Sequence, residues 1–262
     1  MDLPPEIRNQ IYSYIFLPQR VQIHRYQDPR IRNHYRLYHK QLSARDPSTQ
    51  KQAFFPYNNK RFQTQLSLPF VSKQSYQDTL CLLYACTQFV FPSPKVISRF
   101  LEKAPKQAQA AIEHIELHHT MYNEPSLLRF REVKLRSDKS WYLLCERISL
   151  TFTALSVVHV DLKVFDAPIE LEVGESWSLP ILALRGAKAR AARGEGRLGV
   201  LRFARVKLKS HRFECEKIRD VERKLERELM DPVAMQIRED ERLARELAGV
   251  TKASKVLRLV FD

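Results

Sequence analysis

The apolar residues near the N-terminus recur at helical spacing. Ile7, Ile11 and Ile15 lie at i, i+4 and i+8 directly after two prolines, and proline is well tolerated in the first turn of a helix. A second helix is expected over residues 68–84, and a short strand over residues 87–91. The beginning of the sequence therefore predicts two helices followed by a strand.

The stretch between these two helices has no clear period for most of its length. Residues 21–26 alternate as a short strand would, whereas residues 27–66 show neither helical nor strand spacing and contain three prolines. We therefore predict an irregular, basic insertion at about 27–66. Its aromatic residues among Arg and Lys are typical of a surface for single-stranded nucleic acid, and equally of a loop anchored on its own domain.

Short apolar runs alternate with helical segments in the second half of the chain. Runs at 111–117, 157–162 and 198–208 are predicted strands, and helices are expected at 140–155 and after Pro180. This succession, at intervals of about 45 residues, predicts parallel strands joined by right-handed crossovers. It is closer to an irregular array of the leucine-rich-repeat type than to a doubly wound sheet.

The C-terminal segment is dense in charged residues and is predicted to be helical. Residues 214–248 carry an apolar stripe among Glu, Lys and Arg, and Pro232 divides them into two helices. The last apolar run, at 255–261, is predicted to be a strand that joins the sheet. The expected fold class is therefore α+β.

Two segments carry a resemblance to a known family. LPPEIRNQIYSYIF at residues 3–16 and LPFVSKQSYQDTLCLLY at residues 68–84 resemble the helices of fungal F-box-like proteins. The resemblance implies an F-box-like region at residues 1–92, split by the insertion, and a target-binding body at residues 93–262 with irregular β-α units, charged helices and a final strand. It also implies docking onto a Skp-type adaptor of a cullin–RING ubiquitin ligase. The residues implied to contact the adaptor are Leu3, Pro4, Ile7, Ile11, Ile15, Val71 and Leu83.

Positive charge is concentrated in two stretches. The formal net charge is +14 at pH 7, of which residues 20–61 contribute +8 and residues 185–219 contribute +9, so that the remainder is net negative. Such blocks bind nucleic acid or acidic partners, or form solvated loops. The residues predicted to contact an anionic partner are Arg30, Arg32, Arg36, Lys60, Arg61, Arg190, Arg193, Arg197, Arg202 and Arg205.

Signatures of catalysis and of cofactor binding are missing from the sequence. It has no nucleophile elbow, and its glycines at 194–199 precede a predicted strand rather than the helix that a phosphate loop requires. His114 and His118 would lie about 13 Å apart on a strand, without a Cys or carboxylate to complete a metal site. The four cysteines lack a disulfide spacing and are predicted to be reduced, buried thiols.

The sequence therefore predicts a non-enzymatic protein-interaction module with no cofactor and no metal. No apolar run is long enough to cross a membrane, and a signal-peptide pattern is missing, which favours the cytoplasm or the nucleus. Protein partners, with a Skp-type adaptor among them, are the first expectation. The alternatives are a basic protein that binds nucleic acid or acidic partners, and an interaction scaffold with no link to ubiquitin.

Overall fold

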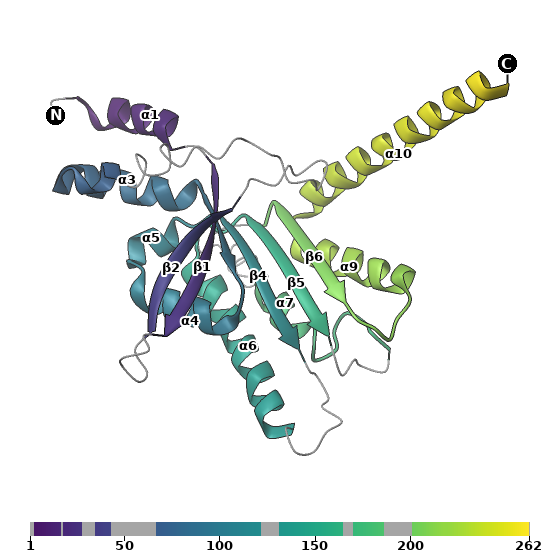
Figure 1. Ribbon diagram of the computed structural model, residues 1–262, viewed down its shortest axis with the longest axis horizontal. Helices are drawn as coiled ribbons and strands as arrows, with labels where there is room; N and C mark the ends of the chain where they lie inside the picture. The colour runs from purple at the N-terminus through teal and green to yellow at the C-terminus, as the bar shows by residue number, and fades with distance from the viewer. Residues whose placement is uncertain are drawn as a thin grey trace.

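A six-stranded sheet forms the centre of the protein (Figure 1). The computed structural model of the chain describes residues 3–16, 18–27, 35–42, 67–121, 131–164, 170–185 and 201–261. The strand order is β2-β1-β3-β4-β5-β6, and all neighbouring strands are parallel except the antiparallel pair β1 and β2. The strands are β1 (Gln19–Gln27), β2 (Tyr35–Leu42), β3 (Thr87–Phe91), β4 (His114–Met121), β5 (Val157–Val164) and β6 (Phe203–Lys209).

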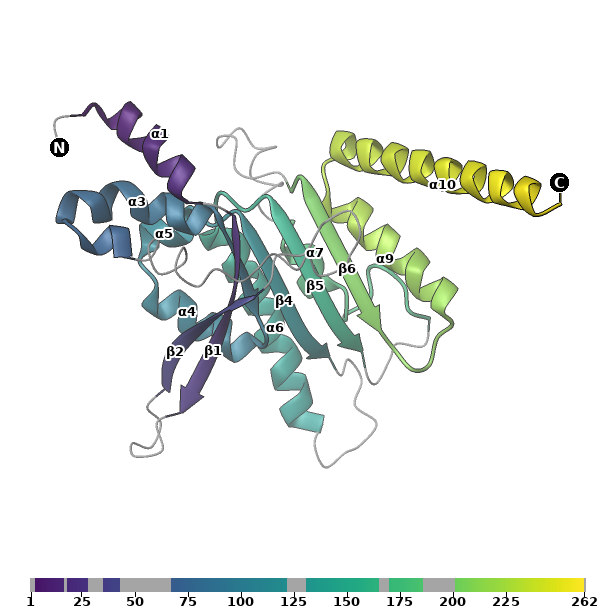
Figure 2. The same cartoon turned by 45° about the horizontal axis from the view of Figure 1, so that its top comes forward.

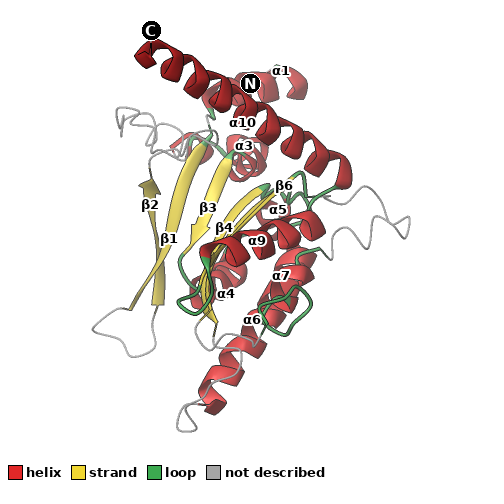
Figure 3. Ribbon diagram, turned by 90° about the vertical axis from the view of Figure 1, so that its right-hand side faces the viewer, coloured by secondary structure: helices red, strands yellow, loops and turns green. Residues whose placement is uncertain are grey.

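Helices cover one face of this sheet. Phe89, Ile115, Val158 and Ala204 lie side by side on neighbouring strands of that face and belong to one core with the buried residues of the helices. From β3 to β6 the strand order follows the chain, and right-handed crossovers then place every connecting helix on the same side (Figure 3). These helices are α4 (Pro94–Lys103), α5 (Lys106–Ala110), α6 (Arg131–Thr151) and α7 (Leu179–Ala183), followed after β6 by α9 (Cys215–Leu229).

The structure confirms the mixed α and β composition and the parallel strands. The strand predicted at 87–91 matches β3, and those predicted at 111–117, 157–162 and 198–208 correspond to β4, β5 and β6 with shifted ends. Among the described helices, none combines the length and the apolar character that a membrane span requires.

The opposite face of the sheet is largely polar and contains a buried ion pair. The Arg20 guanidinium lies 2.7 Å from the Glu116 carboxylate, and the two residues are only 7% and 3% exposed. His118 Nε2 lies 3.0 Å from the other oxygen of Glu116. Arg20 belongs to the first basic stretch of the sequence, and this pairing within the protein neutralises its charge.

Helices α1 (Pro5–Ile15) and α3 (Lys73–Ala85) pack together at one end of the sheet, beside the short 3-10 helix η1 (Leu68–Phe70) (Figure 2). Tyr12 and Phe16 are buried in a small cluster of their own with Leu83. An ion pair of 2.9 Å between Arg8 and Asp78 also joins the two helices. Both helices were expected, but Tyr12 and Phe16, rather than Ile7 and Ile11, form the buried face of α1.

Two predictions of secondary structure were wrong. The expected final strand at 255–261 is the end of α10 (Pro232–Phe261), a helix that extends away from the sheet (Figure 1). The stretch at 27–66 was expected to lack regular structure, yet it contains β2, which forms a hairpin with β1. β2 is an edge strand with mostly exposed or half-buried residues, so its sequence lacks the apolar alternation that marks a buried strand.

Candidate functional site

An exposed apolar surface lies on the N-terminal helices. Because α1 buries Tyr12 and Phe16 against α3, Ile7 and Ile11 lie on its outer side and are 44% and 43% exposed. We call this patch the N-terminal apolar surface; its exposed members are Leu3, Ile7, Ile11 and Tyr14 near and on α1, with Phe70 and Val71 on and after η1. Leu68 of η1 packs against the cluster formed by Tyr12, Phe16 and Leu83, and η1 contacts α3, the helix on which α1 also packs.

Most of the residues predicted to contact an adaptor belong to this surface. Leu3, Pro4, Ile7, Ile11 and Val71 are exposed, and Ile15 is half-buried. Leu83 is a correction, because it is buried against Tyr12 and Phe16 and cannot contact a partner. Phe70, 82% exposed, was missed, although its place one residue before Val71 could have indicated it.

The predicted anion-binding residues do not form one surface in the described part of the chain. Arg36 lies on β2, whereas Arg202 and Arg205 lie next to and on β6, at the opposite edge of the sheet. The other members fall outside the described residues; these are Arg30, Arg32, Lys60, Arg61, Arg190, Arg193 and Arg197.

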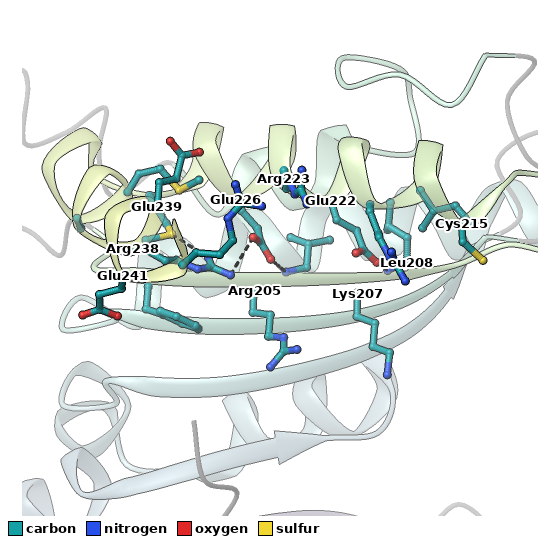
Figure 4. Close-up of a pocket in the computed structure, with 18 of the residues that line it drawn as sticks. Arg205, Lys207, Leu208, Cys215, Glu222, Arg223, Glu226, Arg238, Glu239 and Glu241 are labelled. Atoms are coloured by element: carbon teal, nitrogen blue, oxygen red, sulfur yellow. Dashed lines mark hydrogen bonds and ion pairs between the residues drawn. The ribbon is translucent and has the colours of Figure 1, made fainter. Parts of the chain in front are cut away.

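A groove of about 1580 Å³ runs along β6 between α9 and α10 (Figure 4). Its lining includes ten Lys or Arg residues and four Glu residues, so it is strongly basic. We call it the basic groove. Arg202 and Arg205 contribute to it, and sequence reasoning missed its remaining residues because four separate elements supply them: β5, β6, α9 and α10.

The glutamates of α9 hold the free edge of β6. A Glu222 oxygen accepts a hydrogen bond from the backbone N–H of Leu208 at 2.6 Å, and a Glu226 oxygen accepts one from Val206 at 3.0 Å. Burial raises the pKa of both carboxyl groups. The edge of a sheet otherwise presents unpaired backbone groups, and here the chain's own side chains occupy those groups.

Arg238 connects α10 to the same edge. Its guanidinium donates a hydrogen bond to the Ala204 carbonyl at 2.6 Å and pairs with Glu226 at 2.9 Å. It also lies over the Phe203 ring, 4.7 Å from the centroid. These contacts attach the first part of α10 to the body and define one wall of the basic groove.

The histidines of β4 do not form a metal site. His114 and His118 lie on the polar face of the sheet, whereas His119 lies on the helix face and stacks on Trp141 with ring centroids 4.6 Å apart. Burial lowers the pKa of His119 to about 4. Within the described ranges, no group of three His, Cys, Asp or Glu residues could hold a metal ion.

The cysteines agree only in part with the expectation of buried thiols. Cys145 is buried, and burial raises the pKa of its thiol. Cys86 is half-buried, while Cys81 and Cys215 are exposed. Cys81 was expected in the core, but α3 turns Leu80 and Leu83 inward and leaves Cys81 on its outer side.

Comparison with known proteins places the chain in a family. Residues 1–177 match the family model described as "Domain of unknown function (DUF7730)". No curated protein and no solved structure matches the chain. The match begins before α1 and ends after β5, so it contains the N-terminal apolar surface, whereas β6, α9 and α10 lie beyond it. The chain therefore belongs to the DUF7730 family.

Proposed function

We propose that this chain is a non-enzymatic protein-interaction module whose N-terminal helices dock onto a Skp-type adaptor of a cullin–RING ubiquitin ligase. The observation that carries the proposal is the N-terminal apolar surface. Ile7, Ile11 and Tyr14 expose apolar side chains at helical spacing along one side of α1, and such exposed apolar patches are typical of sites that bind another protein. The resemblance of residues 3–16 and 68–84 to F-box-like helices supplies the identity of the partner.

The way α1 is held supports a docking role. Tyr12 and Phe16 bury one side of the helix, and the Arg8–Asp78 ion pair joins it to α3, so Ile7 and Ile11 are displayed from a fixed frame. A surface whose geometry is already fixed loses little conformational entropy on binding.

The body of the protein supports a role in holding a target. Its parallel strands follow one another in chain order and carry their helices on one face, and we interpret this arrangement as an irregular array of the leucine-rich-repeat type. The face without these helices is rich in polar side chains. We infer that the N-terminal helices bind the adaptor while the body binds the protein to be modified.

The test is a pulldown of the co-expressed chain and Skp-type adaptor at moderate salt. Ile7→Asp/Ile11→Asp places two carboxylates in the apolar contact, so we expect affinity to fall by about 100-fold or more. The matched control is Leu143→Asp/Leu150→Asp, which makes the same changes at two exposed leucines of α6. Circular dichroism of both variants reports whether they stay folded.

The comparison of these variants decides the proposal. Salt-resistant binding that is lost in the folded Ile7/Ile11 variant and kept in the Leu143/Leu150 variant supports adaptor docking through α1. No binding by the folded wild-type chain would refute the proposal and leave an interaction scaffold without a link to ubiquitin.

A further inference from the structure

The basic groove has more positive charge than its own carboxylates can balance. Each of its four glutamates has a contact within the protein: Glu222 and Glu226 bind the edge of β6, Glu239 pairs with Arg227, and Glu241 pairs with Arg245. In contrast, no ion pair links a carboxylate of the described residues to four of the groove's cations, which are Lys163, Arg205, Lys207 and Arg219.

Three of these cations line the groove on two neighbouring elements. Arg205 and Lys207 project from β6 on its polar face (Figure 4), and Arg219 belongs to α9. Burial raises the pKa of Glu222, and the positive charges of Lys207, Arg205 and Arg219 all oppose that rise, so all three lie within electrostatic range of its carboxylate. An anionic partner entering here would meet several cations together.

The groove also contains apolar side chains from the two helices that flank it. Ile218 comes from α9, while Met235 and Ile237 come from α10, and Ile237 is 56% exposed. A partner that fits must therefore combine carboxylates with apolar side chains. An acidic amphipathic helix has this combination, because its apolar residues line one face and its Glu and Asp residues flank them.

Two observations disfavour a stacked single-stranded nucleic acid and an extended peptide as the occupant. The Phe203 ring is covered by Arg238 on α10 and packs against His159, so it offers no free face on which a nucleic-acid base could stack. The backbone groups of Ala204, Val206 and Leu208 at the β6 edge already have hydrogen-bond partners, so an extended peptide cannot add to the sheet there.

We propose that the basic groove between β6, α9 and α10 binds an acidic amphipathic helix of a protein partner. Lys207 and Arg219 would pair with its carboxylates, and Ile237 would contact its apolar face. The groove lies at the other end of the molecule from α1 (Figure 1), so the site does not depend on adaptor docking and the failure of either proposal leaves the other standing.

The test measures binding of the full chain to a fluorescein-labelled synthetic peptide by fluorescence anisotropy. The peptide has Leu at helical i, i+3, i+4 and i+7 spacing and Glu at most other positions. A scrambled peptide of the same composition and a labelled oligo(dT) are the comparison probes. We expect the amphipathic peptide to bind more tightly than either, with an affinity that falls as salt is raised.

Variants of the groove test which residues carry the binding. We expect Lys207→Gln/Arg219→Gln to weaken peptide binding about tenfold, since an exposed ion pair contributes up to about 1 kcal/mol. Ile237→Ser should weaken it about fivefold through the loss of apolar contact. Lys224→Gln on α9 and Leu150→Ser on α6 are the matched controls, because these exposed residues lie outside the groove lining.

Three outcomes would overturn the proposal. The first is no measurable binding of the amphipathic peptide to the folded wild-type chain. The second is equal or tighter binding of the scrambled peptide or of oligo(dT). The third is unchanged affinity in both groove variants when circular dichroism shows them folded.

Discussion

Acidification is expected to destabilise this protein through one buried histidine. His119 is 9% exposed and stacks on Trp141, which is fully buried. Its Nε2 atom has no hydrogen-bond partner in the described part of the chain. Protonation would therefore place a positive charge in an apolar site, and for this reason burial lowers the pKa of His119 to about 4.

The sign and size of the effect follow from linkage. The unfolded chain, with a histidine pKa of about 6.5, takes up the proton more readily than the folded chain, so stability falls as the pH drops from about 6.5 through about 4. At 1.36 kcal/mol per pH unit, the loss between pH 7 and pH 4 is about 3 kcal/mol. That is a large part of the stability of an ordinary domain.

The matched variant is His119→Phe, which keeps an aromatic ring against Trp141 and cannot be protonated. Urea unfolding followed by far-UV circular dichroism at pH 7, 5.5 and 4 gives the unfolding free energy of both proteins. We expect similar stabilities at pH 7 and a deficit of about 3 kcal/mol for the wild type at pH 4. Circular dichroism is preferred to fluorescence because a protonated imidazole beside Trp141 would alter the emission.

Other titrating groups are present in both proteins and cancel in the comparison. Burial lowers the pKa of His114 and adds to the acid sensitivity. Burial raises the pKa of Glu222 and Glu226, so their contribution is lost as the pH rises and acts in the opposite direction. Parallel pH profiles for wild type and His119→Phe, with a difference below about 1 kcal/mol at pH 4, would refute this reasoning.

Three further perturbations test other contacts. Arg20→Ala should lower the free energy of unfolding, measured in urea, by about 3–5 kcal/mol, because it leaves the Glu116 carboxylate buried without its guanidinium. Arg20→Met/Glu116→Leu should recover most of that loss. A decrease below about 1 kcal/mol for Arg20→Ala would contradict burial of the pair. Glu226→Ala should lower the free energy of unfolding by about 2 kcal/mol because it leaves the Val206 N–H without its acceptor, and Glu226→Gln should lower it less. Equal decreases for the two variants would contradict the hydrogen bond. Phe16→Ala should release α1 from α3, so amide hydrogen exchange should become faster in α1 and stay slow in the central strands. Faster exchange in α1 and in the central strands alike would show that α1 is part of the main core.

The local sequence pattern predicted the element bounds well where a compact apolar run or a proline marks them. Residues 87–91 form β3 within the predicted bounds, and Pro232 separates α9 from α10 as expected. At these positions the apolar spacing and the proline determine the secondary structure of their own segment, so the neighbouring residues are sufficient to predict it.

The prediction was wrong at residues 255–261, where the same apolar run is compatible with a strand and with a helix. Val256, Leu257, Leu259 and Val260 satisfy a strand as well as a helix, and a run this short cannot distinguish the two by period. No proline or glycine lies between Lys252 and Phe261, so the helix that begins at Pro232 can continue through them.

The candidate sites were predictable only to the extent that they are local. Ile7 and Ile11 were identified because one helix carries both. The Arg20–Glu116 pair joins residues that are distant in the sequence, and the basic groove combines Lys163, Lys207 and Arg219 from three elements. Their proximity depends on the strand order and register, which composition and spacing do not specify.

The contacts of Glu222 and Glu226 with β6 determine whether a further strand could be added to this sheet. An array of strand-helix units lengthens when one more strand pairs with the last, and here the last strand has already given its outward Val206 and Leu208 N–H groups to α9. α9 therefore acts as a terminal cap. A further strand could pair with β6 only if these two glutamates and the Arg238 contact with the Ala204 carbonyl were removed. The helices that follow β6 thus end the sheet at this strand.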